Sequence, residues 1–183
     1  MKYVTLLRGV NVGGKNQIRM PKLKACFEKM GFADVFTYIQ SGNVIFTTDE
    51  KNADILIEKI EAELSNAFNY RSRVVLLSQD QLEAVVKDAP KGFGTKPDCF
   101  RYDVIFIKNP LTPSEAIKSL AVKKGVDEVS EGKEVLYTSR LVSRLSQSRL
   151  SRIVATPAYQ NMTIRNWNTT TKLLSLADSF GQM

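Results

Sequence analysis

The stretch VFTYIQSGNVIFTT, residues 35–48, indicates two β-strands joined by a tight turn. Val35–Gln40 and Val44–Thr48 are rich in β-branched and aromatic residues, which favour extended backbone. Ser41-Gly42-Asn43 between them has the composition of a hairpin turn. The centre of the first half of the chain is therefore predicted to be an antiparallel strand pair.

A strand and a helix are expected on each side of this hairpin. Upstream, residues 2–8 predict a strand, and residues 21–30 predict a helix that stops at Gly31. Downstream, residues 56–68 place apolar side chains every three or four positions, which predicts a helix, and residues 73–77 predict a strand. The order β-α-β-β-α-β is that of the ferredoxin-like split βαβ unit, in which helices back one face of an antiparallel sheet.

The same order is expected again after a connector rich in glycine and proline, residues 91–100. The predicted strands are residues 103–107, 126–130, 134–138 and 162–165. Three helices are predicted. The first begins at the capping box 112–115, the second is the basic, serine-rich stretch that carries Leu145, Leu150 and Ile153, and the third is residues 168–178. The fold class is therefore α+β, with tandem ferredoxin-like units at residues 1–90 and 101–183.

Composition excludes several kinds of chemistry. The 183 residues include two cysteines and no histidine, which rules out Ser-His-Asp and Cys-His catalysis and every histidine-containing metal site. Cys26 and Cys99 cannot form a four-sulfur zinc site, and no calcium-loop pattern occurs, so we expect neither a metal nor a cofactor. No apolar run is long enough to span a bilayer, and we expect a cytoplasmic protein with no membrane partner.

Positive charge is concentrated in two segments. The formal net charge is +7. Residues 1–27 contain six basic residues and no acidic one, and the same is true of residues 139–177. Clustered positive charge attracts phosphates, nucleotides or nucleic acid. Two solvated helix faces would give the same pattern, and the sequence leaves both interpretations open.

The stretch Gly9-Val10-Asn11-Val12-Gly13-Gly14-Lys15-Asn16 nearly matches a phosphate-binding P-loop. Asn16 stands where that loop needs a hydroxyl to hold magnesium, and Pro21 places the helix start several residues late. These two departures argue against an NTPase loop. An anion-binding loop that uses backbone N–H groups and Lys15 remains, as does a tight turn with a solvated lysine.

Arg165-Asn166-Trp167-Asn168-Thr169 is a dense polar cluster at a predicted strand-to-helix junction. An asparagine there is a natural helix cap, and Trp167 is a natural core residue. Arg165 is different, because a cation at a helix start is unfavourable unless an anion shares the site.

Residues 7–16 (LRGVNVGGKN), 38–44 (YIQSGNV) and 163–169 (TIRNWNT) together resemble an uncharacterised bacterial family, domain of unknown function 1697. The resemblance implies a cytoplasmic protein of two ferredoxin-like halves. It implies no activity and assigns no catalytic residue.

Three functions are therefore compared. The first is binding of an anionic ligand, either a nucleotide-like metabolite or nucleic acid. The expected contacts are Arg8, Asn11, Gly13, Gly14, Lys15 and Arg165. The second is a histidine-independent, metal-free enzyme acting on a phosphorylated or carboxylated small molecule, with Lys15 or Tyr38 as acid/base and Arg165 as electrostatic stabiliser. The third is a protein interaction module, and the oligomeric state is left open.

Overall fold

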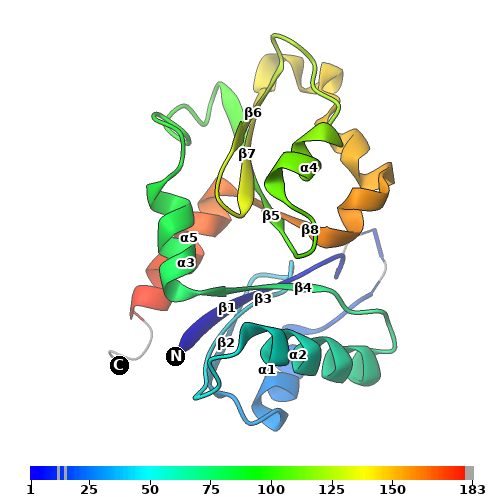
Figure 1. Ribbon diagram of the computed structural model, residues 1–183, viewed down its shortest axis with the longest axis vertical. Helices are drawn as coiled ribbons and strands as arrows, with labels where there is room; N and C mark the ends of the chain where they lie inside the picture. Colours follow the sequence, from blue (N-terminus) through cyan, green and yellow to red (C-terminus); the bar gives the residue numbers. More distant parts are fainter. Residues whose placement is uncertain (12, 15, 180–183) are drawn as a thin grey trace. The chain divides into compact units, whose positions relative to one another are not determined.

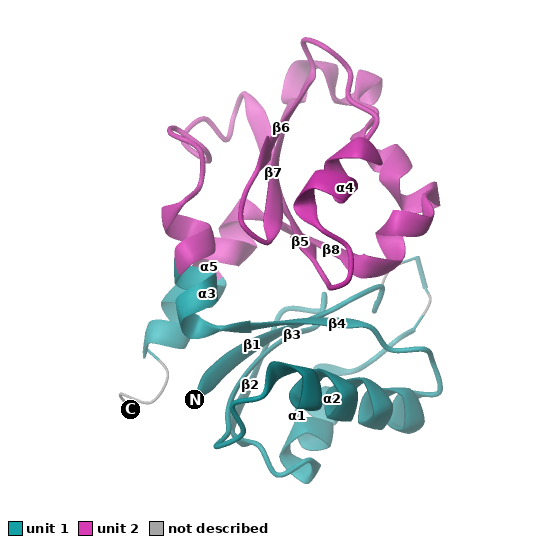
Figure 2. Ribbon diagram, in the orientation of Figure 1, with its two compact units in different colours: residues 1–83, 173–183 teal, residues 84–172 magenta. Residues whose placement is uncertain are grey.

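The computed structural model describes residues 1–11, 13–14 and 16–179, which form two compact units (Figure 2). Unit 1 comprises Met1–Glu83 together with Leu173–Met183, and unit 2 comprises Ala84–Lys172. The divisions fall inside two helices, α3 (Gln79–Lys87) and α5 (Trp167–Ser179). Each unit is therefore described by itself.

Unit 1 is built on a four-stranded antiparallel sheet in the order β2-β3-β1-β4 (Figure 1). The strands are β1 (Lys2–Leu7), β2 (Ala33–Tyr38), β3 (Asn43–Thr47) and β4 (Val74–Ser78). Helices α1 (Met20–Lys29) and α2 (Ala53–Phe68) follow β1 and β3 along the chain. Both pack on the same face of the sheet, where they share one apolar core with alternate strand residues.

That core is centred on aromatic rings from both layers. Phe27 of α1 lies 5.6 Å from the Phe46 ring of β3, and Phe32 stacks on Phe46 at 4.3 Å. Leu23 and Leu64 extend the same cluster from the two helices. Apolar residues at three- and four-residue steps along each helix produce this buried face.

Unit 2 repeats the sheet order as β6-β7-β5-β8. The strands are β5 (Phe100–Ile107), β6 (Asp127–Glu131), β7 (Val135–Leu141) and β8 (Met162–Asn166). All neighbouring pairs are antiparallel, and α4 (Pro113–Lys118) begins at the expected capping box of Thr112 and Glu115. The predicted fold class is confirmed: two four-stranded antiparallel sheets, each backed by helices, as in tandem ferredoxin-like units.

One predicted helix is wrong. The serine-rich stretch after β7 does not form an α-helix but three 3-10 segments, η1 (Val142–Gln147), η2 (Leu150–Ala155) and η3 (Pro157–Asn161). Ser148 is extended between the first two, with φ −59° and ψ 141°, and its hydroxyl accepts the Leu150 N–H. Serine hydroxyls compete for backbone hydrogen bonds in this way and so disfavour helix interiors. Leu150 and Ile153 are buried as expected, whereas Leu145 is exposed.

The glycine- and proline-rich connector is a packed loop of unit 2. Phe93 makes edge-to-face contacts with Tyr102, Tyr137 and Trp167, at centroid distances of 4.8, 5.4 and 5.1 Å. Gly94 lies so close to Trp167 that an added Cβ would stand 2.2 Å from the indole nitrogen. The loop therefore covers Trp167. No helix among the described residues has the length and apolar character needed to cross a bilayer.

Candidate functional site

The loop after β1 uses left-handed backbone repeatedly. Gly9, Asn11, Gly13, Gly14 and Asn16 all have positive φ, between 48° and 76°. Glycine adopts this region freely and asparagine tolerates it better than most residues, which explains the composition of the motif. The Asn11 N–H donates to the Asn16 carbonyl at 3.1 Å, and the Asn16 side-chain amide donates to the Gly9 carbonyl at 3.0 Å. The loop is thus closed on itself.

Asn11 joins this loop to two neighbouring segments. Its amide nitrogen donates to the Ile18 carbonyl at 3.0 Å and to the Gln40 carbonyl at 2.7 Å. Its amide oxygen accepts the Ile18 N–H at 2.8 Å. Both ends of the carboxamide are therefore engaged within the protein, and the side chain holds the loop against the turn between β2 and β3.

Gly42 brings the same two motifs into direct contact. Its carbonyl accepts the Leu7 N–H at 2.8 Å. A Cβ at position 42 would lie 2.6 Å from the Val10 Cγ2 and 2.9 Å from the Leu7 Cβ, and φ there is +74°. Only glycine fits both the conformation and the space. The LRGVNVGGKN and YIQSGNV motifs therefore form one structural assembly.

A pocket opens where these motifs meet the start of α1. Its volume is about 580 Å³. The described residues that line it are Asn11, Gly14, Gln17, Ile18, Arg19, Met20, Pro21 and Gln40. They supply an apolar wall, carboxamide groups and one guanidinium, and none of these described lining residues is acidic.

The N-terminus of α1 forms one wall of this pocket. Arg19 is the N-cap residue, and Met20 and Pro21 are the first residues of the helix. Within the described structure no side chain caps this end, and the first turn contains no acidic residue. The partial positive charge of a helix start is therefore reinforced by Arg19 rather than neutralised.

The predicted contacts differ in their relation to the pocket. Asn11 and Gly14 line it. Arg8 is half-buried beside β4, with its backbone N–H donating to the Arg73 carbonyl at 2.9 Å, and neither Arg8 nor Gly13 belongs to the described lining. Lys15 lies outside the described residues.

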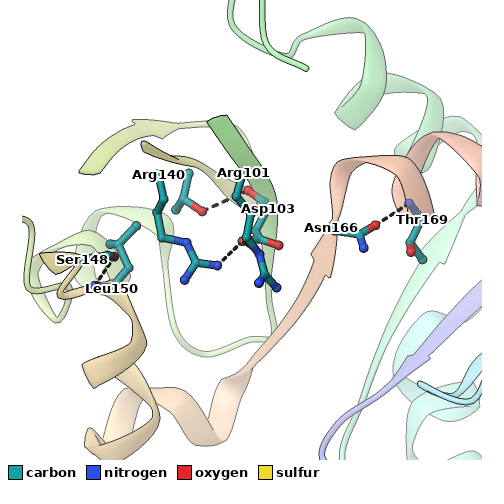
Figure 3. A network of polar contacts seen from close by, with 8 residues as sticks. Arg101, Asp103, Arg140, Ser148, Leu150, Asn166 and Thr169 are labelled. Atoms are coloured by element: carbon teal, nitrogen blue, oxygen red, sulfur yellow. Dashed lines mark hydrogen bonds and ion pairs between the residues drawn. The ribbon is translucent and has the colours of Figure 1, made fainter. Parts of the chain in front are cut away.

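Arg165 belongs to unit 2 and lies on β8, directly before the residue that caps α5. Its side chain is 7% exposed, and it donates to the Thr163 hydroxyl at 3.1 Å and to the Ile164 carbonyl at 2.9 Å. Burial lowers the pKa of this guanidinium to about 10. The helix cap is Asn166, whose side-chain oxygen accepts the Thr169 N–H at 2.7 Å (Figure 3). A single anion site formed by Arg165 and the loop after β1 stays a prediction.

The second basic segment contains another engaged arginine. Arg140 of β7 forms an ion pair with the buried carboxylate of Asp103 on β5, at 2.5 Å, and Arg101 lies 3.3 Å from the same oxygen (Figure 3). Within this segment, Arg140 and Arg165 thus serve internal contacts, whereas Arg144, Arg149 and Arg152 are exposed. Residue counts overestimated the charge that this segment offers to a partner.

Sequence reasoning missed most of the pocket lining. Pro21 is predicted only as the start of a helix and Gln40 only as a strand end, and none of residues 17–20 is predicted to belong to a site. The available signal was the acid-free sequence around a proline-started helix, because such a helix end attracts anions. Nothing in the sequence indicated that Gln40 would be brought to this helix.

The described lining of the pocket includes a guanidinium and the start of a helix, and it offers no carboxylate for acid/base chemistry. Nor do the described residues contain a group of three or more acidic or cysteine side chains suited to a metal ion. Fold and site together define a two-unit α+β protein with a pocket in unit 1. The chain belongs to the family described as "Protein of unknown function (DUF1697)", whose model matches residues 1–137.

A solved structure resembles nearly the whole chain. It is that of the conserved bacterial protein SP0830 from Streptococcus pneumoniae, with 28% sequence identity and a TM-score of 0.83. The match covers 96% of this chain and 98% of that protein. No curated protein matches the chain.

Proposed function

We propose that this protein binds a small anionic metabolite in the pocket of unit 1, with the anionic group at the start of α1. The observation that carries the proposal is a cavity of about 580 Å³ whose wall includes an uncapped helix N-terminus and Arg19. Backbone N–H groups at a helix start, together with the helix dipole, favour a phosphate or carboxylate.

The surrounding charge supports an anion rather than a cation. The pocket lies mainly in the acid-free segment of residues 1–27, and Gln40 adds a neutral group from the neighbouring turn. Lys22 in the first turn of α1 is exposed and adds to the positive potential. A negatively charged ligand would therefore meet attraction from several sources and repulsion from none of the described lining residues.

Cavity size supports a metabolite rather than a polymer. Pockets of roughly 300–1,000 Å³ are typical of small-molecule and cofactor sites. Nucleic acid would instead need an extended positive surface, and the binding of a short oligonucleotide with a steep salt dependence would contradict this part of the proposal. A cytoplasmic location also belongs to the proposal, because both cysteines are free thiols, as expected in a reducing compartment.

A thermal-shift screen tests the proposal directly. Inorganic phosphate, phosphosugars, nucleotides and a short oligonucleotide are added to the full chain, since a ligand that binds only the folded protein raises its Tm. We expect at least one small phosphate compound to raise the Tm. No shift with any of them, up to millimolar concentrations, would contradict anion binding.

Paired charge variants then locate the site. Arg19→Ala is expected to weaken binding of the best compound about tenfold, the scale of a charge-assisted hydrogen bond. Lys29→Ala removes the same charge from an exposed position at the other end of α1 and serves as the matched control. Equal losses in the two variants would indicate a general charge effect and would place the ligand elsewhere.

A further inference from the structure

A second, smaller pocket lies on one face of the unit 2 sheet. Its volume is about 130 Å³, and its described lining residues all belong to unit 2. Tyr102 of β5 is paired with Ser139 of β7, and Ser139 is paired with Glu128 of β6. Residues paired across antiparallel strands carry their side chains on the same face of the sheet. These three residues therefore form one row across the sheet, and all three line the pocket.

Four of the described lining residues are aromatic. Phe100 and Tyr102 come from β5, Tyr137 from β7, and Phe93 from the loop after α3. The Phe93 ring centroid lies 4.8 Å from that of Tyr102 and 5.4 Å from that of Tyr137, with the planes inclined at 65° and 73°. Phe93, Phe100 and Tyr102 are only half-buried, so part of their surface is open to a ligand. Aromatic surface from two strands and a loop thus encloses the pocket.

Contacts within unit 2 hold these rings in place. Tyr137 is buried, and its hydroxyl donates to the Val85 carbonyl at 2.6 Å. Phe93 also packs edge-to-face against Trp167, at a centroid distance of 5.1 Å. Since the fold already fixes these side chains, little conformational entropy is lost when a ligand binds beside them.

Glu128 gives this aromatic pocket a negative charge. Its carboxylate accepts the Ser139 hydroxyl at 3.4 Å, which places the charge beside another lining residue. The electron-rich faces of aromatic rings attract ammonium groups, which is how proteins recognise quaternary ammonium ligands. Lys91 also lines the pocket, but it is exposed, and long lysine side chains keep their ammonium group in water. Rings and carboxylate together therefore favour a cation.

We propose that this pocket binds the organic ammonium group of a small metabolite, between the aromatic rings and the Glu128 carboxylate. A volume of about 130 Å³ suits a group of trimethylammonium size. It is well below the roughly 300–1,000 Å³ typical of sites that enclose a larger ligand. The site uses none of the residues of the proposed anion site in unit 1, and neither proposal depends on the other.

Two compounds of the same shape test the charge. Choline carries a trimethylammonium group, and dimethylbutanol is its uncharged analogue, in which carbon replaces the nitrogen. Binding of each compound to the full chain is measured by NMR titration at constant ionic strength. We expect choline to bind about fivefold more tightly, which corresponds to a cation–π contribution of about 1 kcal/mol.

Two variants then test the groups that hold the cation. Glu128→Gln removes the charge at nearly constant size, and Phe100→Leu removes an aromatic face but keeps an apolar side chain. Each should weaken choline binding about threefold or more and leave dimethylbutanol affinity within about twofold. Glu131→Gln is the matched control, because Glu131 also lies on β6 but accepts the Ser114 hydroxyl, at 2.7 Å, on the other face of the sheet. It should change neither affinity.

Equal affinity for choline and dimethylbutanol would overturn the proposal, because the pocket would then take any apolar group of that size. Absence of choline binding up to tens of millimolar would overturn it as well. Equal losses of choline affinity in Glu128→Gln and Glu131→Gln would indicate a general charge effect and contradict the site. A peptide that carries trimethyllysine offers the same cation, and tighter binding of this peptide than of choline would overturn the assignment to a free metabolite. The comparison of choline with dimethylbutanol uses the unchanged protein and stays decisive even if a variant lowers the Tm.

Discussion

At the scale of single residues, Gly42 shows how a turn motif depends on packing as well as on conformation. The Leu7 and Val10 side chains occupy the space where a Cβ at this position would lie. Its positive φ and its buried position act together. The glycine is therefore required by the neighbouring loop and not by the hairpin alone.

Gly42→Ala is expected to lower the free energy of unfolding by about 2–4 kcal/mol, from left-handed strain plus overpacking. Gly31→Ala is the matched control, since φ is +85° there but nothing lies within 4 Å of the added Cβ. Gly31→Ala should lower the free energy of unfolding by only the cost of left-handed backbone, about 1–2 kcal/mol. Urea midpoints of the two variants give the comparison, and equal losses would show that position 42 is less crowded than the structure has it.

Arg165 is expected to contribute to the stability of the fold because its side chain is buried. Arg165→Ala should lower the free energy of unfolding by about 2–4 kcal/mol, because it leaves a cavity and deprives the Thr163 and Ile164 oxygens of a donor. Arg152→Ala removes an exposed arginine and should stay within about 0.5 kcal/mol. Chemical denaturation of both variants tests this, and an unchanged stability for Arg165→Ala would contradict a packed guanidinium.

At the scale of elements, the stretch after β7 shows where periodicity is insufficient. Leu150 and Ile153 are spaced as on a helix and are buried, yet the backbone divides into short 3-10 segments. The division is fixed by Asp127 on β6, whose carboxylate accepts the Arg149 N–H at 3.0 Å and the Lys123 N–H at 2.8 Å. The local pattern of apolar residues could not predict that Arg149 would donate to a carboxylate 22 residues away in sequence.

Asp127 is expected to make stability depend on acid pH. Burial alone would raise the pKa of this carboxyl group, but hydrogen bonds from Arg149, Ser148 and Lys123, with the charge of Arg140, bring it below its ordinary value. The folded state therefore gains stability from the ionised group above the ordinary pKa of about 4, and this gain is lost as the pH falls through the lowered pKa.

Asp127→Asn should lose about 1–3 kcal/mol of unfolding free energy at pH 7. The difference from the unchanged protein should narrow as the pH falls below about 4, where the carboxylate becomes protonated. Urea denaturation at a series of pH values measures both quantities. A difference that stays constant down to pH 2 would contradict a lowered pKa for Asp127.

At the scale of the whole molecule, the order of helices and strands could be predicted because local sequence signals mark where these elements begin and end. Proline at the start of α1, the Thr112 capping box and the two hairpins all lie where those signals place them. The pocket could not be predicted in the same way. Its lining combines Gln40 with residues 11–21, and this meeting depends on the tight packing of Gly42 against Leu7 and Val10.

Unit 1 is discontinuous in sequence, and this bears on how the protein is made. The side chain of Lys2 donates to the Ala177 carbonyl, and Gln79 donates to Asp178 at 2.8 Å, so the last helix completes a unit that the first strand begins. The chain is synthesised from its N-terminus, so the first strand emerges from the ribosome before the last helix. During synthesis the first sheet therefore lacks its contacts with Ala177 and Asp178 until residues 173–179 have left the exit tunnel.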